Sequence, residues 1–459
     1  MDCKVSNKSK KNLTFTVRDE FKRKSVAEKV SLLLESPIDV SPMVIDGGWG
    51  TGKTEFCHKL INLMMDKDSH HLIYVDAFQA DHADEPLLTI LAEILKVLPE
   101  GEQREGFVQK VLPTIRYGLK TLAKAGVAHV LKQDTDTVLD GFDKEIQQIA
   151  DKAIDSSVES LLKDHIKANE SLETLQKTMA DLTEVKPIIV FIDELDRCRP
   201  DFAVSILEVI KHTFSVDGVQ FVLVTNTHQL KASINHRYGD SVNAQQYLDK
   251  FLKFTFILPN SFSESASYTK SLVSVHHYRN LVNQSPILGA LNLTENAEFS
   301  FISHIIKVQH LSLREVETLV RYIEIYQQLS GEKALSTNIV FGYKLLRLFG
   351  VVLFCFNKQI ASSLTQSRAD AKQIAEYLGE HQIVPIHEGS LDAEHHQVIL
   401  TMIAQECWYN SALFEPSDEH HDSEWHHLIE AYFRRAGFPP RKGERSKITV
   451  EAIQTLNLM

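Results

Sequence analysis

A run of eight residues near the N-terminus has the composition of a phosphate-binding loop. Residues 47–54 read Gly-Gly-Trp-Gly-Thr-Gly-Lys-Thr and fit the pattern G-x-x-x-x-G-K-[ST]. Glycines let successive backbone N–H groups converge on phosphate oxygens, and the helix that follows directs its positive end at the same charge. We expect Lys53 to contact the β- and γ-phosphates and the Thr54 hydroxyl to bind Mg²⁺. The predicted phosphate-binding residues are Gly47, Gly48, Trp49, Gly50, Thr51, Gly52, Lys53 and Thr54.

Two acidic residues follow an apolar run much further along the chain. The run at 188–192 is typical of a buried strand, and Asp193 and Glu194 come directly after it. Beside a phosphate loop, Asp193 would hold Mg²⁺ through water and Glu194 would polarise the attacking water. The ordinary alternative is a pair of acids that simply begins the next segment.

Asn226 follows another apolar run, at 219–225, and is a candidate sensor of the γ-phosphate. The alternative is that this asparagine only forms a turn. Neither of the two Asn-Lys pairs in the chain is followed by Asp two residues later, so the guanine-recognition pattern of GTPases is missing. The predicted nucleotide is therefore ATP.

The elements that must position these residues alternate between strands and helices. Apolar runs predict strands at 12–17, 42–45, 71–76, 188–192 and 219–225. Apolar spacing predicts helices at 21–34, 54–65 and 201–214. Continuous apolar strands between helices are typical of a parallel sheet that is covered on both faces.

We therefore predict an α/β fold of the P-loop NTPase type. The core is expected at 20–265, with a helical insertion at 86–185 because no convincing strand occurs there. A helical lid at 266–335 and a mostly helical C-terminal domain at 336–459 would follow. The segment from Tyr343 to Phe356 is apolar nearly all round, which indicates buried core or an interface.

Composition limits the function classes. The chain has 459 residues and a formal net charge of −12, with 43% hydrophobic and 24% charged residues, as in ordinary globular proteins. An acidic chain is not expected to cover nucleic acid nonspecifically, although its net charge does not exclude a local basic groove. Five dispersed cysteines indicate free thiols in a reducing cytoplasm. No apolar run approaches the roughly 20 residues of a membrane span, so we predict no transmembrane segment and a cytoplasmic location.

Two segments near the C-terminus invite other functions. Eight of the 21 histidines fall between 381 and 427, and Glu394-His395-His396 and His420-His421-Asp422 have only part of the spacing of a metal site. We expect these histidines to lie on the surface. Residues 434–447 carry six basic side chains, and a solvated linker is the expected form of this segment.

Three parts of the sequence together resemble a known family. They are the Trp-containing loop at 47–54, the string Phe-Ile-Asp-Glu-Leu-Asp-Arg-Cys-Arg-Pro at 191–200, and Tyr247-Leu-Asp-Lys-Phe251 followed by Leu258-Pro259. In these parts the chain resembles the KAP family of P-loop NTPases, over about residues 20 to 330. The resemblance implies an ATPase with an AAA-like strand order and a helical insertion. It also implies links to membranes or, in bacteria, to mobile elements and phage exclusion.

The resemblance also assigns roles to single residues. It implies that Asp193 is the Mg²⁺-side acid, that Glu194 fills a site where an acid is expected, and that Asp196 and Arg197 complete the segment. The segment 311–319 is similar to the sensor-arginine segment of the lid, without the usual proline, and makes Arg314 a candidate γ-phosphate contact. The alternative is a solvated helical arginine. Candidates for an arginine finger acting in trans are Arg197, Arg199 and Arg237.

Three functions remain open on the sequence. The first is a Mg²⁺-dependent ATPase that acts as a regulatory switch or motor in phage defence or a mobile element, as a homo-oligomer or with a separate effector protein. The second is a DNA-stimulated ATPase, which the acidic composition disfavours. The third is an ATP-binding scaffold without hydrolysis, which the intact Lys53, Asp193 and Glu194 disfavour.

Overall fold

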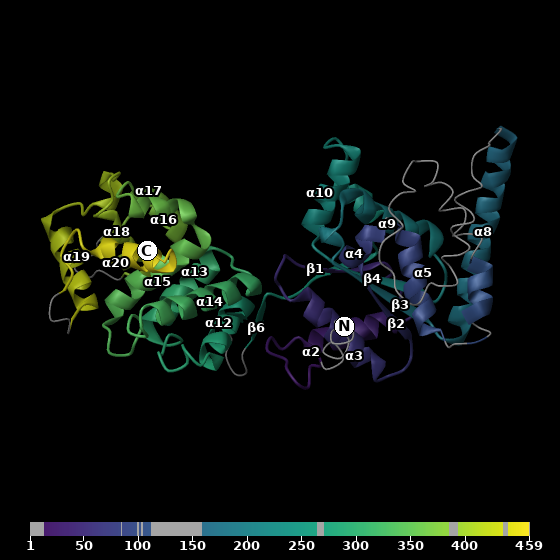
Figure 1. Ribbon diagram of the computed structural model, residues 1–459, viewed down its shortest axis with the longest axis horizontal. Coiled ribbons are helices and arrows are strands. Elements are labelled where there is room, and N and C mark those ends of the chain that lie inside the picture. The colour runs from purple at the N-terminus through teal and green to yellow at the C-terminus, as the bar shows by residue number, and fades with distance from the viewer. Residues whose placement is uncertain are drawn as a thin grey trace. The chain divides into compact units, whose positions relative to one another are not determined.

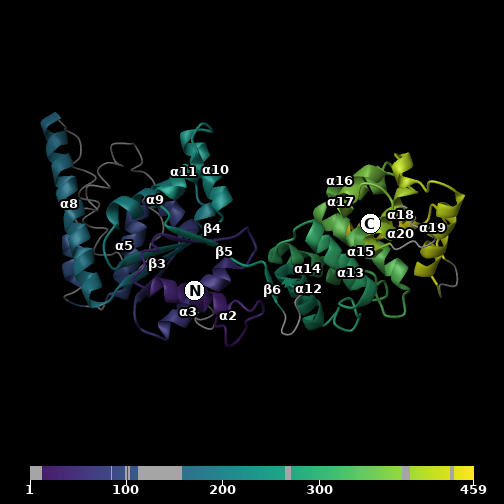
Figure 2. The same ribbon diagram turned by 180° about the vertical axis from the view of Figure 1, so that it is seen from behind.

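The chain forms two compact units, Met1–Pro259 and Asn260–Met459. The structure is a computed structural model that describes residues 13–83, 85–98, 101, 104–111, 158–263, 270–384, 393–434 and 439–458. Figures 1 and 2 show the elements of each unit from two opposite sides.

The first unit is built on a five-stranded parallel sheet with the order β2-β3-β4-β1-β5. The strands are β1 (Met43–Asp46), β2 (His71–Asp76), β3 (Ile188–Asp193), β4 (Val219–Thr225) and β5 (Phe254–Ile257). All six residues of β3 are buried, as expected for a central strand with helices on both of its faces. The side chains of β3 divide between two cores: Ile189 and Phe191 pack into one and Ile188, Val190 and Ile192 into the other.

Helices cover both faces of this sheet (Figure 1). The core that contains Ile189 also includes side chains of α2 (Lys24–Leu34) and α3 (Lys53–Met65). The opposite core includes side chains of α5 (Pro86–Val97), α8 (Val158–Val185) and α9 (Pro200–Thr213). The unit also contains α4 (Ala77–Ala80), η1 (Asp81–Ala83), η2 (Leu195–Arg197), α10 (Thr227–Tyr238) and α11 (Ala244–Asp249). The arrangement is the α/β fold of P-loop NTPases that the strand pattern predicted.

Two predictions about strands were wrong. The strand predicted at 12–17 does not form: residues 15–17 form a turn, residues 13 and 14 have no regular structure, and Asn12 lies outside the described residues. The Thr14 hydroxyl accepts from the Val17 N–H (3.3 Å), so the side chain offers the backbone a local partner in place of a strand. The second error is an omission: β5 was not predicted, although three of its four residues are apolar. The run is short, and its side chains are exposed or half-buried.

The second unit is mostly helical and begins with a small antiparallel pair, β6 (Ser261–Ser263) and β7 (Lys270–Leu272). Strand β7 lies within the range 266–335 that was expected to form a helical lid. The helices are α12 (Val273–Gln284), α13 (Asn296–Val308), α14 (Leu313–Leu329), α15 (Phe341–Phe356), α16 (Lys358–Thr365), α17 (Ala371–Leu378), α18 (His395–Ala404), η3 (Ala412–Phe414), α19 (Glu419–Tyr432) and α20 (Arg445–Leu456). One hydrophobic core joins the segments predicted as lid and as C-terminal domain.

The helical insertion is described only at its two ends. Helices α5 and α8 lie inside the predicted range of 86–185, whereas residues 112–157 are outside the described residues. Within the insertion, apolar spacing also predicts a helix from Phe142 to Leu162, and most of this range lies outside the described residues. Among the described helices, none combines the length and the apolar character that a membrane span requires.

The centre of the second unit is α15, which is buried as its all-round apolar surface predicted. Gly350 of α15 packs directly against α20, because a Cβ atom at this position would lie 2.5 Å from the Thr449 carbonyl oxygen and 2.8 Å from the Ala452 Cβ. We expect Gly350→Ala to lower the free energy of unfolding by about 1–3 kcal/mol through overpacking. Thermal unfolding measures this loss. Gly106→Ala is the control, since no atom lies within 4 Å of a Cβ there, and equal Tm values for the two variants would contradict the close packing.

Candidate nucleotide-binding site

The predicted phosphate loop connects β1 to α3 and forms a tight cradle. Gly50 (φ 70°) and Gly52 (φ 82°) adopt left-handed backbone conformations that glycine tolerates best. A Cβ atom at Gly47 would lie 2.9 Å from the Thr51 hydroxyl oxygen, so this position accepts no larger side chain without movement. Gly52 is the N-cap of α3 and has no side chain to cap the helix. The first N–H groups of α3 therefore stay available to an anion.

Lys53 is buried and folds back over the loop. Its ammonium donates to the carbonyl oxygens of Gly47 (2.6 Å) and Gly48 (3.0 Å). Burial lowers the pKa of Lys53, against the opposing effect of nearby carboxylates, of which Asp196 and Asp193 contribute most. The cation is thus held inside the cradle that a triphosphate would enter.

Thr54 and Asp193 are brought together from α3 and the end of β3. The Thr54 hydroxyl lies close enough to the Asp193 carboxylate to lower its pKa, and this carboxylate accepts from the Tyr74 hydroxyl (3.1 Å) and the Glu194 N–H (2.8 Å). Burial raises the pKa of Asp193, and these hydrogen bonds oppose the rise. Oxygen atoms of a hydroxyl and a carboxylate are ligands that suit Mg²⁺, so the two residues fit the predicted metal site.

Glu194 occupies an unusual backbone conformation. Its φ of 60° is left-handed, which is uncommon for residues other than glycine and is found at functional sites. The Glu194 carboxylate pairs with the Arg197 guanidinium at 3.0 Å. Partial burial raises the pKa of Glu194, and Arg197 opposes the rise. The carboxylate is therefore fixed beside Asp193 at the carboxyl end of β3.

Asp196 connects three parts of the site. Its carboxylate accepts from the Trp49 indole N–H (2.5 Å) at the tip of the loop and from the Thr225 hydroxyl (3.2 Å) at the end of β4. Trp49 is half exposed. Two of the three segments that carry the family resemblance are thus in direct contact, an arrangement that sequence spacing alone did not indicate.

Asn226 lies where β4 ends, next to the start of the loop. β1 and β4 are neighbours, with Asp46 opposite Thr225, and the Gly47 N–H donates to the Thr225 carbonyl (3.3 Å). The Asn226 side chain caps α10 by accepting from the His228 N–H (3.1 Å). The residue therefore has the turn-forming role that was the alternative interpretation, and sensing of the γ-phosphate stays a prediction.

Arg23 is a part of the site that the sequence analysis missed. Its guanidinium is buried and donates to the carbonyl oxygens of Thr51 (3.0 Å) and Pro259 (2.9 Å). Burial lowers its pKa to about 10. Arg23 thus fixes the phosphate loop to the last residue of the first unit. A single arginine at the end of a basic N-terminal stretch gave no signal of this role.

The arginines considered as phosphate contacts have partners within the chain. Arg199 contacts Asp81 (3.1 Å), and Arg237 donates to the Asp201 carbonyl (2.8 Å). Arg197 pairs with Glu194. Each of the three candidates for an arginine finger therefore already has a polar partner within the first unit. Arg314 is exposed in the first turn of α14, in the second unit. Its contact with a phosphate stays a prediction.

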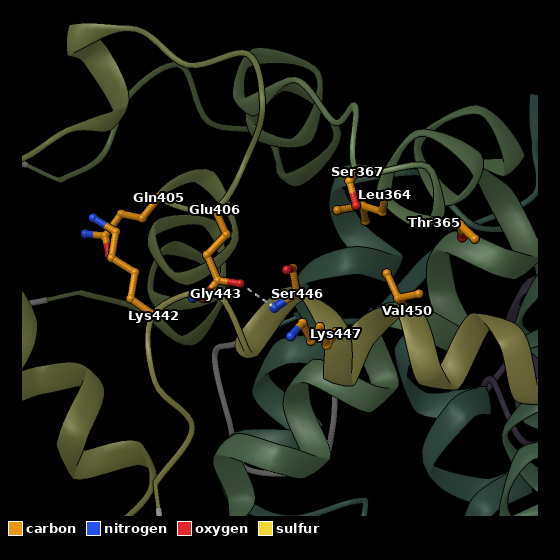
Figure 3. Close-up of a pocket in the computed structure, with 10 residues that line it drawn as sticks. All are labelled: Leu364, Thr365, Ser367, Gln405, Glu406, Lys442, Gly443, Ser446, Lys447 and Val450. Carbon is orange, nitrogen blue, oxygen red and sulfur yellow. Dashed lines mark hydrogen bonds between the residues drawn. The ribbon is translucent and has the colours of Figure 1, made fainter.

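A pocket of about 380 Å³ lies elsewhere, among α16, α18 and α20 of the second unit (Figure 3). At its wall the Glu406 carboxylate accepts from the backbone N–H groups of Gly443 (2.7 Å) and Ser446 (2.8 Å) at the start of α20. A carboxylate of the chain itself therefore fills the anion-binding end of this helix. We assign no nucleotide to this pocket.

Comparison with known proteins decides the family. A model of the KAP family P-loop domain matches residues 23–330. The chain belongs to the KAP family of P-loop NTPases. No curated protein matches this KAP protein. Among solved structures, the crystal structure of Cdc6p from Pyrobaculum aerophilum matches with 12% sequence identity, coverage of 94% of both chains and a TM-score of 0.36, which is too distant to support an argument.

The family resemblance expected from the sequence is thereby confirmed. The match includes the Trp-containing loop, the segment around Asp193 and the segment that ends at Pro259, and it begins at the buried Arg23. The described cysteines of the KAP protein, Cys57, Cys198, Cys355 and Cys407, are free, as predicted.

The position of Trp49 in the loop, in contact with Asp196, allows its fluorescence to report nucleotide binding. Because Trp49 lies at the tip of the loop and is half exposed, we expect ATP to change its fluorescence, and Trp49→Phe to remove the change. Titration with ATP under tryptophan excitation measures it. Trp408→Phe is the control, since Trp408 is exposed in the second unit. A full signal change in the Trp49 variant would show that another tryptophan reports binding.

Proposed function

We propose that this KAP protein is a Mg²⁺-dependent ATPase that cleaves the γ-phosphate of ATP. The observation that carries the proposal is the grouping of Lys53, the Thr54–Asp193 pair and Glu194 around one glycine-rich loop. Each of these residues has a chemical group that hydrolysis would use, and all of them lie in the first unit.

Each side chain has a distinct task in the proposed reaction. The loop N–H groups and Lys53 would bind the β- and γ-phosphate oxygens and stabilise the charge that spreads over them in the transition state. Lys53 would exchange its two carbonyl partners for phosphate oxygens. Glu194 would orient the attacking water and accept its proton.

Thr54 and Asp193 would hold the metal ion. When bound, Mg²⁺ neutralises charge on the phosphate oxygens. Tyr74 and the Glu194 N–H donate to the Asp193 carboxylate, which orients it and favours its charged form against the effect of burial. Asp196 would hold the loop next to the end of β3, because its carboxylate accepts a hydrogen bond from Trp49.

Release of inorganic phosphate from ATP tests this proposal. We expect release with Mg²⁺-ATP and none after chelation of the metal. With radiolabelled ATP as substrate, added GTP should inhibit release of the label less than added unlabelled ATP. Because a partner is expected to stimulate the reaction, the assay is run on the protein alone and with cell extract from its own source. Binding of ATP with no release under either condition would favour the ATP-binding scaffold.

We further propose that hydrolysis drives a regulatory switch in an assembly. The support is the family, whose members are linked to phage exclusion and mobile elements, together with a second unit large enough to hold a core of its own. Sedimentation with and without ATP tests for a homo-oligomer, and co-purification tests for an effector protein. Stimulation by DNA with a steep salt dependence would favour the DNA-stimulated alternative. Absence of a partner, together with infection unchanged by deletion, would exclude the defence role.

A further inference from the structure

Three potential metal ligands meet in the second unit, far from the nucleotide site in the sequence. His304 lies in α13, Glu394 is the N-cap of α18, and His396 lies in the first turn of α18. One ligand atom from each of the three lies within 4.8 Å of the other two. We propose that His304, His396 and Glu394 bind a divalent transition-metal ion of the Zn²⁺ class.

Hydrogen bonds set both histidines in the tautomer that a metal needs, with the lone pair on Nδ1. His304 Nε2 contacts the Leu378 carbonyl oxygen (2.8 Å), and His396 Nε2 contacts the Glu380 carboxylate (2.8 Å). Both partners only accept hydrogen bonds, so each Nε2 carries the proton, and in the neutral rings each Nδ1 keeps its lone pair. Metal-binding histidines commonly have such a carbonyl or carboxylate partner on the other nitrogen.

The two Nδ1 atoms have no donor to satisfy them among the residues that the structure describes. The nearest charged group to His396 Nδ1 is the Glu394 carboxylate, at 3.5 Å. A lone pair that faces a carboxylate is repelled by it, and a bound cation turns this repulsion into attraction at both atoms. The two Nδ1 lone pairs and the Glu394 carboxylate therefore favour a bound cation over the empty arrangement.

Packing brings the two imidazoles together before any ion binds. Their centroids lie 3.4 Å apart and their planes differ by 9°. His396 is buried and His304 is half-buried, whereas Glu394 is exposed. Because the two ring planes are nearly parallel, coordination of one ion by both Nδ1 atoms requires the rings to tilt away from this stacked arrangement. Glu394 lies on the solvent side and can close over the ion.

The ligand types select the class of metal. Two imidazoles and one carboxylate are a common Zn²⁺ set that leaves one position for water, while Mg²⁺ and Ca²⁺ prefer oxygen ligands alone. Binding would connect α13 to α18 and, through Leu378 and Glu380, to the end of α17. The expected effect is a stiffer second unit. The site is independent of ATP hydrolysis.

The sequence did not reveal this cluster. The Glu394-His395-His396 string was noted, but its third ligand lies in another helix, and the neighbouring His395 contacts the Tyr432 hydroxyl (2.6 Å) instead. The expectation that the histidines lie on the surface was wrong for His396 and His421, which are buried, and correct for His381, His420, His426 and His427. His387 lies outside the described residues.

Titration of the full chain with Zn²⁺ against a chromophoric chelator tests the proposal. We expect one tight site per chain, at least tenfold weaker in Glu394→Gln and in His304→Gln. The exposed Glu394 keeps the test valid if the His304 variant does not fold. His427→Gln is the control, because it removes an exposed histidine of the same region. No binding by the wild type at tens of micromolar, or equal binding by Glu394→Gln, would overturn the proposal.

Cobalt provides a readout of the ligand set. Co²⁺ bound by two imidazoles and a carboxylate in tetrahedral geometry absorbs visible light, and we expect this absorption in the wild type and in His427→Gln. Absence of this absorption from the wild type would contradict the proposed ligand set. Its survival in His304→Gln would show that other residues bind the metal. A rise in Tm with Zn²⁺ that Glu394→Gln lacks would show that the ion binds the folded unit.

Discussion

Replacing Lys53 by alanine is expected to lower the rate of phosphate release from Mg²⁺-ATP by at least two orders of magnitude. The ammonium lies inside the loop, where it donates to the carbonyl oxygens of Gly47 and Gly48, and it is the cation that the transferred phosphoryl group would meet. Removal of one preorganised group that stabilises developing charge typically lowers the rate about 10²–10³-fold. Phosphate release under saturating ATP measures the effect.

Two controls separate this chemical effect from loss of structure. Lys53→Ala removes hydrogen bonds inside the loop, so its thermal unfolding is compared with that of the wild type. Lys96→Ala removes a lysine from α5 of the same unit, where it pairs only with Glu93 at the surface, and should keep the full rate. Hydrolysis by Lys53→Ala near the wild-type rate would mean that phosphate is bound elsewhere.

Glu194→Gln is expected to keep ATP binding and lower hydrolysis by about 10²–10⁴-fold, the usual contribution of a general base. The substitution preserves size and removes the charge that accepts the proton from water. Measured together, nucleotide affinity and phosphate release distinguish this result from a damaged loop. Glu93→Gln, which removes an acid of α5, is the matched control. A fall in affinity equal to the fall in rate would assign Glu194 to binding instead.

The same carboxylate sets the expected pH dependence. Burial raises the pKa of Glu194 above the ordinary value of a glutamate, and only the charged form accepts a proton. The rate should therefore fall as the pH drops through this raised pKa, at a higher pH than for an ordinary glutamate. A rate–pH profile of the wild type against residual hydrolysis by Glu194→Gln checks this, because the acid limb should disappear in the variant.

Much of the first unit follows from short-range patterns. Apolar runs located β1 to β4, and the eight residues at 47–54 located the loop, because its chemistry depends on neighbours in the sequence. The Asp193-Glu194 pair at the end of β3 was also predictable, since the ends of parallel strands meet at one edge of the sheet. Trp49 was placed in the loop, but its bond to Asp196 depends on packing between distant segments.

The features that escaped prediction depend on contacts between distant residues. β5 is apolar at three of its four residues but is short and largely exposed, and pairing with β1 holds it in the sheet. Arg23 acts on carbonyl oxygens of Thr51 and Pro259, and backbone acceptors carry no sequence signature. His304 meets His396 only because α13 and α18 pack together. In each case the partner is fixed by tertiary structure and has no fixed spacing along the chain.

The position of β1 in the sheet has a consequence for synthesis of the protein. β1 carries the phosphate loop, yet it pairs only with β4 and β5, where Met43 faces Val222 and Phe254. A ribosome that has made the first 200 residues has therefore made the loop without either strand that supports it. The nascent chain cannot close its nucleotide site until residue 257 has left the exit tunnel, and the apolar side chains of β1 must stay protected from misfolding until then.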